Sequence, residues 1–388
     1  MGDTLSLKRA DIMNKIIPFL FLVIFFSCRE QDSELNKKIR LFDNTEISST
    51  DLTDFLKEQI DSLGIPGISI AIINEGKLVY SENIGYANLD TRKALDENSI
   101  FEAASLSKPV FAYMVMKLSE RGAIELARPL YYYLPDSLME VDQRYKNVNA
   151  IHVLSHSTGF PNWRWFDTPP DSLEIDRGTF YMIDNPGNSF TYSGEGYDYL
   201  ARVIASNTEH KMSELDNLFK KLVQKPLGIE HMYFTWDEYL YEHKVYGHID
   251  GKVNNRNWGS GLPYQNSYKF SPSGGLHTNA ENYAKFLIAV MNGKGLLPET
   301  SKEMLKPRTV VKRSHNRYKE DGNTHWSLGF AITPLKNDTL YNHGGTHSDF
   351  QSQTAFSKNS KFGYVFFVNT KKGDELNKTL KEFLRIRK

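Results

Sequence analysis

Apolar residues recur at helical spacing in four stretches of the chain, with polar residues between them. In the first stretch Leu52, Leu56 and Ile60 share one face, and Gly64-Ile65-Pro66 ends the pattern. A period near 3.6 indicates an amphipathic helix, and glycine followed by proline is a stop signal. The same reasoning predicts helices over 52–63, 105–121, 279–292 and 374–384. For the third helix, Thr278 and Glu281 are a predicted capping-box pair.

Short apolar or alternating runs bounded by turn residues predict strands near both ends of the chain. Residues 68–73 and 77–86 flank Asn74-Glu75-Gly76 and predict a β-hairpin. Further predicted strands span 327–332, 339–342, 351–356 and 363–369. The middle of the chain, about 130–263, is poor in strand signals and contains helical patterns over 197–206 and 213–223.

This order of elements predicts an α+β fold. The expected core is an antiparallel sheet flanked by helices and built from the N- and C-terminal segments, with a mainly helical subdomain inserted at about 130–263. We expect this domain to span 50–388 and to hold a small-molecule site in the cleft between its two parts.

The overall charge argues against a nucleic-acid partner. The 388 residues include 47 Lys+Arg and 47 Asp+Glu, so the formal charge is 47 − 47 = 0. A neutral chain lacks the basic surface that nucleic-acid binders use. A hydrophobic content of 40% is that of a globular protein and excludes a disordered chain.

The N-terminus predicts an exported protein. Lys8, Arg9 and Lys15 precede an apolar run over 16–26, and Ser27-Cys28 follows it. This run is too short to span a membrane, so residues 1–27 indicate a secretory signal peptide. Either Met1 or Met13 is compatible with the start of such a signal.

Cys28 is the single cysteine of the chain, which excludes an intrachain disulfide and cysteine-ligated structural zinc. The Ser-Cys pair resembles the lipobox of bacterial lipoproteins, although Phe25-Phe26 departs from the usual residues before it. This resemblance implies a lipid-anchored protein of the bacterial cell envelope, on its periplasmic or surface side, with Cys28 acylated and 28–49 as a tether. An ordinary signal or an uncleaved anchor is the alternative.

Ser105-Leu106-Ser107-Lys108 is the strongest candidate for catalysis. Positions three apart lie on one face of a helix. A serine hydroxyl is a weak nucleophile until a neighbouring base activates it, and an amine one turn away supplies such a group. Taken alone, an S-x-x-K pattern is more often a solvated pair of side chains.

Two further motifs strengthen this interpretation. Tyr192-Ser193-Gly194 lies in the helical insertion, and His343-Gly344-Gly345-Thr346 follows a predicted strand. The three motifs, in this order, resemble those of the serine β-lactamase and penicillin-binding family, nearest to class C β-lactamases, D-stereospecific peptidases and related esterases. Further segments that look like family landmarks extend the resemblance over about 51–369. These segments are 64–67, 101–109, 122–135, 154–161, 226–228 and 273–276.

The resemblance implies a role for each motif. Ser105 is the acylated nucleophile, and Lys108 and Tyr192 share the general-base and general-acid work. The backbone N–H groups of Ser105 and Thr346 form the oxyanion hole, while His343, Gly344, Gly345 and Gly194 contact the substrate. No cofactor and no metal are implied.

Two departures from the β-lactamase pattern favour an esterase or a D-peptidase. Gly194 stands where lactamases usually have the asparagine that binds the acylamino group, and His343 stands where they usually have lysine. The expected substrate is a small molecule or a cell-wall-type peptide. A β-lactamase, or a non-catalytic binding or sensor lipoprotein of the same fold, remains an alternative, and the sequence leaves the oligomeric state open.

Other residues allow two interpretations each. Trp163, with Phe160, Trp165 and Phe166, either lines the acyl pocket or packs inside the insertion. The pairs His152/His156 and His343/His347 have the spacing of helical metal ligands, but they lack the glutamate of H-E-x-x-H. His156 is therefore interpreted as a hydrogen-bonded loop residue.

Overall fold

The computed structural model describes residues 37–169, 173–254 and 270–387. Its centre is a nine-stranded antiparallel sheet that joins the two ends of the domain, because β16 pairs with β3. The α+β prediction is confirmed. In spatial order the strands are β11 (Thr309–Val310), β12 (His325–Trp326), β13 (Ala331–Pro334), β14 (Thr339–Thr346), β15 (Gln351–Phe356), β16 (Gly363–Val368), β3 (Gly67–Asn74), β4 (Lys77–Asn88) and β5 (Lys93–Ala94).

Helices cover both faces of this sheet, which is why β3 is apolar almost throughout. Ile68, Ile70 and Ile72 pack with helices α2 (Ser49–Leu63) and α12 (Gly373–Phe383) on one face. Ala71 and Ile73 belong to the core on the other face, with α3 (Ser107–Glu120) and α9 (Ala280–Asn292). Side chains of a strand alternate between faces, so a strand covered on both sides reads as one continuous apolar run.

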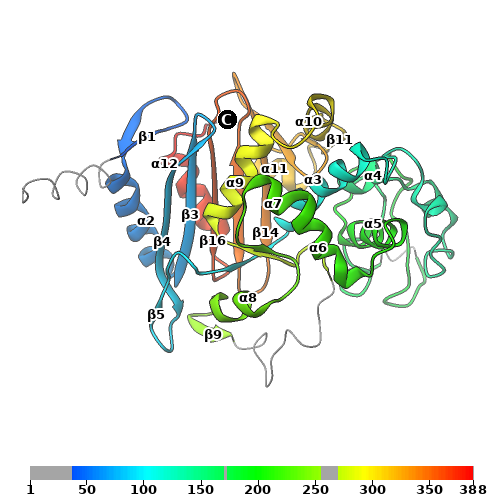
Figure 1. Cartoon of the computed structure of the whole chain (residues 1–388), viewed down its shortest axis with the longest axis horizontal. Coiled ribbons are helices and arrows are strands. Elements are labelled where there is room, and N and C mark those ends of the chain that lie inside the picture. The colour runs from blue at the N-terminus through cyan, green and yellow to red at the C-terminus, as the bar shows by residue number, and fades with distance from the viewer. Residues whose placement is uncertain (1–36, 170–172, 255–269, 388) are drawn as a thin grey trace, which may run out of the picture.

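Most of the inserted subdomain lies at the opposite end of the molecule from α2, with α4 and α5 at the right of Figure 1, whereas α8 and β9 lie below the sheet. Its helical elements are η1 (Leu130–Tyr132), η2 (Gln143–Asn147), α4 (Ala150–Leu154), α5 (Gly194–Asn207), η3 (Met212–Glu214), α6 (Leu215–Phe219), η4 (Lys220–Gln224), α7 (Lys225–Leu227) and α8 (Glu238–His243). The predicted helix over 213–223 is thus a succession of three short segments, η3, α6 and η4. Short strands β7 (Met232–Tyr233), β8 (Gly247–Ile249) and β9 (Lys252–Asn254) follow.

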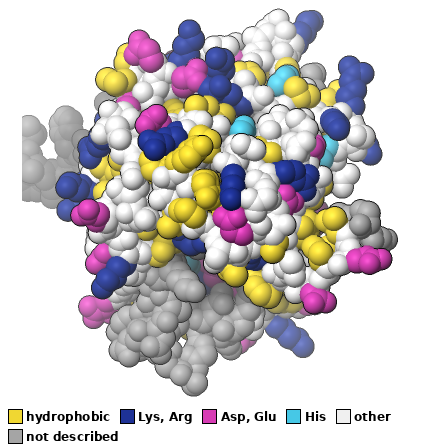
Figure 2. Space-filling model, turned by 90° about the vertical axis from the view of Figure 1, so that its right-hand side faces the viewer, with side chains coloured by type: hydrophobic (Ala, Val, Ile, Leu, Met, Phe, Trp, Pro, Cys, Tyr) yellow, Lys and Arg dark blue, Asp and Glu magenta, His cyan; other side chains and the backbone are white. Residues whose placement is uncertain are grey.

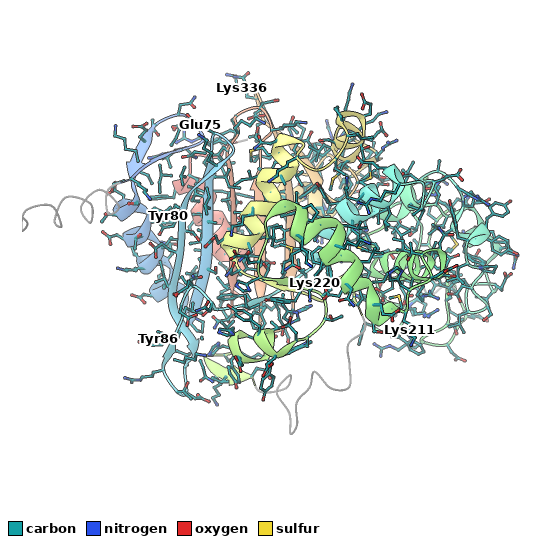
Figure 3. All side chains as sticks on the ribbon, in the orientation of Figure 1. Glu75, Tyr80, Tyr86, Lys211, Lys220 and Lys336 are labelled. Atoms are coloured by element: carbon teal, nitrogen blue, oxygen red, sulfur yellow. The ribbon has the colours of Figure 1, made fainter. Side chains whose placement is uncertain are left out.

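One continuous core connects the sheet to the subdomain. It includes Val365 and Phe367 of the sheet, Phe111 of α3 and Tyr197 of α5. Figure 3 shows side chains filling the space between the ribbons, with Tyr80 and Tyr86 on β4 at the left and Lys211 and Lys220 on the subdomain. A small sheet of β6 (Phe101–Ala104), β10 (Leu276–Thr278) and β7 runs across this junction.

The outer surface of the subdomain carries both charges. Figure 2 faces this end of the molecule and shows apolar side chains lying between positive and negative ones. The exposed large apolar residues include Tyr132, Leu138, Val141, Trp165 and Phe166.

Two local predictions are wrong. Helix α9 begins after Asn279, whose side chain accepts from the Asn282 N–H, whereas Thr278 belongs to β10. Thr278 pairs with Met232 in the small sheet, which keeps it extended. The predicted strand 327–332 is interrupted by a tight turn, in which the Ser327 N–H donates to Phe330 O at 2.8 Å and Gly329 has φ 101°. Helices α10 (Pro298–Leu305) and α11 (Asn316–Asp321) complete this region.

The folded domain begins earlier than the predicted boundary at residue 50. Strands β1 (Lys38–Arg40) and β2 (Glu46–Ser48) form a hairpin, and Ile39 and Leu41 are buried in the core beneath α2. Part of the predicted tether over 28–49 is therefore ordered structure, because its apolar side chains cover one end of the sheet. The predicted signal 1–27 and Cys28 lie outside the described residues. Among those described, no helix is both long and apolar enough to cross a bilayer.

We predict that Ile39→Ala lowers the free energy of unfolding by about 2–4 kcal/mol, because it removes a fully buried side chain. Urea denaturation measures this change. Lys38→Ala, at an exposed position of the same strand, is the control and should change stability little. Equal stability of the two variants would mean that the hairpin is not part of the cooperative domain.

Candidate active site

Ser105 lies in the tight turn between β6 and α3. Ala104 before it has φ 47°, a left-handed conformation that is uncommon outside glycine. The Ser107 hydroxyl fixes the turn by donating to Ala104 O at 2.6 Å and accepting from the Leu276 N–H at 2.9 Å. Helix α3 starts at Ser107, so Ser105 precedes the helix that was predicted to begin with it. The turn leaves Ser105 partly exposed while its neighbours are buried.

Lys108 approaches Ser105 from the first turn of α3. Its side chain is almost fully buried, and Nζ donates to Ser105 Oγ at 3.1 Å and to Ser273 O at 2.6 Å. A buried lysine amine needs such partners because it has left water. The structure therefore brings the two residues of the S-x-x-K motif into direct hydrogen-bond contact.

The ring of Tyr192 lies close to the same amine. Lys108 Nζ is 4.8 Å from the centre of the Tyr192 ring. The tyrosine immediately precedes α5, whose N-cap Ser193 accepts from the Gly196 N–H at 3.0 Å. The phenol oxygen is buried and has no hydrogen-bond partner among the described residues. The Ser105 hydroxyl and the Lys108 amine, from one turn of chain, thus lie close to the ring of a tyrosine from a distant segment.

Strand β14 brings the third motif to this point. A Cβ at position 345 would collide with Ala103 O and Ser352 Oγ and would lie 3.0 Å from Ser105 N, so Gly345 allows an approach that a larger residue would prevent. The His347 N–H donates to Phe350 O at 2.9 Å. Successive N–H groups of an antiparallel strand point in opposite directions. The N–H of Thr346 therefore points away from β15, and Thr346 itself is exposed.

His343 is placed deeper than a cleft-lining residue. It is 1% exposed, Nδ1 lies 2.8 Å from Gly344 O, and its ring centre is 6.2 Å from that of Tyr192. Burial holds its pKa well below the ordinary 6.5, and the nearby Lys108 and Arg317 lower it further. The imidazole is therefore neutral, and the Gly344 carbonyl places its proton on Nδ1.

Gly194 and Trp163 are in contact. A Cβ at position 194 would collide with the indole of Trp163, which is half-buried. The Gly194 N–H is bound by the Asn162 side-chain oxygen at 3.0 Å. Phe160, another aromatic candidate for lining the acyl pocket, is fully buried, and its ring centre lies 4.9 Å from that of Phe180. Trp165 and Phe166 are exposed. Trp163 thus occupies the space that a side chain at 194 would fill.

Asp198 is a residue near the site that the motifs did not reveal. Its carboxylate accepts from Ser273 Oγ at 3.2 Å, and the carbonyl of Ser273 binds Lys108. Burial raises its pKa to about 6, against the hydrogen bond from Ser273 and the charge of Lys108, which lower it. Asp198 lies one helical turn after Gly194 on α5, and this spacing is a signal that the sequence offers.

The two histidine pairs are used for hydrogen bonds. His152 Nδ1 accepts from the Asn149 N–H, and His156 Nδ1 accepts from the Ser193 N–H at 3.1 Å. His347 Nδ1 lies 2.6 Å from the buried Glu102 carboxylate. Within 37–169, 173–254 and 270–387, no group of three or more His, Cys, Asp or Glu side chains has a metal-binding arrangement.

Comparison with known proteins gives one family over most of the chain. The family model described as Beta-lactamase matches residues 52–386. Protein flp of Staphylococcus aureus (strain NCTC 8325 / PS 47) is 22% identical over 344 residues, which are 82% of this chain and 64% of that protein. The chain thus spans less than two thirds of the length of this curated relative.

Other matches agree on the fold. Penicillin-binding protein 4* of Bacillus subtilis (strain 168) is 31% identical over 140 residues, 33% of this chain and 30% of that protein. A beta-lactamase of Yersinia enterocolitica is 22% identical over 292 residues, 74% of this chain and 68% of that protein. The octameric penicillin-binding protein homologue from Pyrococcus abyssi superposes with a TM-score of 0.69 at 22% identity, over 84% of this chain and 74% of that one.

We predict that Asp198→Asn stabilises the protein relative to wild type as the pH rises from 4 to 7. A folded pKa of about 6, above the ordinary 3.8, means that the folded state favours the protonated acid. That contribution to stability is complete below about pH 4 and is lost as the pH rises through 6. Denaturation at several pH values measures the difference. Asp54→Asn, at an exposed position of α2, is the control, and a pH-independent difference for Asp198→Asn would contradict the prediction.

Proposed function

Because this chain belongs to the beta-lactamase family of serine hydrolases, we propose that it cleaves an ester or an amide through a covalent acyl-enzyme on Ser105. The observation that carries the proposal is the position of Lys108 Nζ, 3.1 Å from Ser105 Oγ and 4.8 Å from the Tyr192 ring centre. A nucleophile in contact with a buried amine, beside a phenol, is the arrangement that covalent catalysis needs.

Acylation then proceeds by proton transfer to the Lys108–Tyr192 pair. The Ser105 hydroxyl gives up its proton as Oγ bonds to the substrate carbonyl carbon, and the carbonyl oxygen becomes an oxyanion. The N–H groups of Ser105 and Thr346 stabilise this charge, each by roughly 3–4 kcal/mol. The bond to the leaving group breaks, and the leaving alcohol or amine takes a proton from the pair. In the second step, water attacks the acyl carbon and gives a proton to the same pair. The bond to Ser105 Oγ breaks, Oγ takes a proton back, and the carboxylic acid is released.

The surroundings of Tyr192 support an esterase or D-peptidase rather than a β-lactamase. Trp163 fills the space beside Gly194, so no side chain at that position reaches an acylamino group. His343 is neutral and buried, so it offers a substrate carboxylate no charge. Both features weaken binding of a penicillin-like acid and leave small neutral acyl groups unaffected.

The N-terminal sequence adds a proposal about location. An exported lipoprotein anchored through Cys28 would act on small molecules or cell-wall-type peptides in the bacterial envelope. The basic, apolar and Ser27-Cys28 segments support this proposal.

We predict that a fluorophosphonate probe labels wild type and not Ser105→Ala. Lys108→Ala or Tyr192→Phe should lower the labelling rate by at least about 10³-fold, because each removes part of one catalytic unit. Mass spectrometry of the labelled peptide identifies the site, and circular dichroism controls for folding. Absence of label on folded wild type would favour the binding or sensor alternative.

We also predict a substrate preference that Trp163 controls. Wild type should hydrolyse p-nitrophenyl esters or D-alanyl p-nitroanilide with a higher kcat/KM than nitrocefin. Trp163→Ala should raise the kcat/KM for esters of bulky acids by about ten-fold, since it opens the space next to Gly194. Trp165→Ala, at a neighbouring exposed position, is the matched control. Nitrocefin as the best wild-type substrate would instead identify a β-lactamase.

A further inference from the structure

We propose that His156 is the positioning residue for Tyr192, and that it acts by holding the tyrosine main chain on both sides and its ring from one face. The inference rests on the proposed function, in which Tyr192 takes part in acylation. It assigns no proton transfer to His156 itself.

The main-chain contacts enclose Tyr192 on both sides. The N–H of Thr191, the residue before it, donates to His156 O at 2.7 Å. The N–H of Ser193, the residue after it, donates to His156 Nδ1 at 3.1 Å. A shift of the Tyr192 main chain would therefore break a buried hydrogen bond at one side or the other, and each unsatisfied buried group is costly.

The side chains add a second restraint. The imidazole of His156 stacks on the Tyr192 ring, with centres 4.1 Å apart and planes 28° from parallel. Trp326 and Tyr197 lie against the same imidazole at 5.2 and 5.3 Å between centres, so it is fully buried. The ring of His156 is fixed by these neighbours and limits the tilt of the phenol toward Lys108.

The protonation state suits this role. Because Nδ1 accepts from a backbone N–H, the proton of the neutral ring lies on Nε2. Burial holds the pKa of His156 well below 6.5, and Lys108, His343 and Arg317 lower it further. The ring facing Tyr192 is therefore uncharged and does not compete with Lys108 for the phenol.

The backbone of His156 is in an unusual conformation that makes these contacts possible. Its φ is 54°, and its N–H donates to Val153 O at 3.1 Å just after α4. Histidine is one of the few residue types enriched in this left-handed region, although the conformation still carries a cost. Glycine would adopt it more easily but would supply neither Nδ1 nor the ring. This combination points to a requirement for the imidazole at this position.

Two substitutions separate the two restraints. His156→Asn tolerates the left-handed backbone and keeps an acceptor near Nδ1, but it loses the ring. His156→Phe keeps an aromatic ring and loses the acceptor. Each substitution is introduced into the wild-type protein and into the Tyr192→Phe variant. The rate at which a fluorophosphonate modifies Ser105 is then measured against probe concentration, which gives kinact and KI.

The expected result is a fall in kinact of roughly 10–100-fold for His156→Phe, with KI nearly unchanged. His156→Asn should retain more of the rate. In the Tyr192→Phe background neither substitution should lower kinact further, because the group being positioned is absent. An equal, additive loss in both backgrounds would overturn the proposal and leave His156 with a general structural role.

A stability control and an activity-independent measurement complete the test. Phe160→Leu alters another fully buried ring of the same loop and should reduce thermal stability without the selective loss of kinact. The tyrosine ¹³Cζ resonance that is present in the NMR spectrum of wild type and missing from that of Tyr192→Phe is assigned to Tyr192. It should shift or broaden in both His156 variants, and an unchanged resonance would overturn the proposal. If wild type is not labelled, the proposed function fails, while the resonance still tests the positioning.

Discussion

The contact between Lys108 and Ser105 is the interaction on which the rest of the site depends. Lys108 is 2% exposed, so the protein must supply acceptors for its amine, and here they are Ser105 Oγ and Ser273 O. Ser105 and Lys108 come from one turn of chain, whereas Ser273 comes from the segment before β10. The Tyr192 ring, from the helical subdomain, covers the same amine. Sheet and subdomain must therefore pack as one body for the amine to remain buried, and the continuous core between them provides this.

Close approach of main chains is the second constraint. Ala104 takes a left-handed conformation at the end of β6, and Gly345 lets β14 lie directly against that turn. The two N–H groups proposed for the oxyanion hole belong to these two segments. Their spacing is set by backbone packing and not by mobile side chains, which favours the preorganised dipoles that stabilise developing charge.

The surroundings of Tyr192 are mainly apolar and aromatic, and two cations, Lys108 and Arg317, lie over its ring at 4.8 and 5.4 Å from the centre. His156 and His343 are both buried and neutral, and Trp326 packs against each of them. The two histidines therefore hold the phenol in place without adding a positive charge of their own for an acidic substrate. The two neutral histidines and Trp163 beside Gly194 therefore link the packing around Tyr192 to the proposed substrate preference.

The sequence alone determined much of this protein because the relevant signals are local. Hydrophobic periodicity located α2, α9 and α12, and short apolar or alternating runs located β3, β4 and β15. Motif order indicated the family and the Ser105, Lys108 and Tyr192 set. Local signals failed where distant segments impose the conformation: pairing with Met232 makes Thr278 a strand residue, and burial beneath α2 orders Ile39 within the expected tether. The position of Trp163 beside Gly194, the pKa of Asp198 and the enclosure of Tyr192 by His156 were decided by tertiary structure. Each depends on burial and on contacts between residues far apart in sequence, and no spacing along the chain encodes these distances.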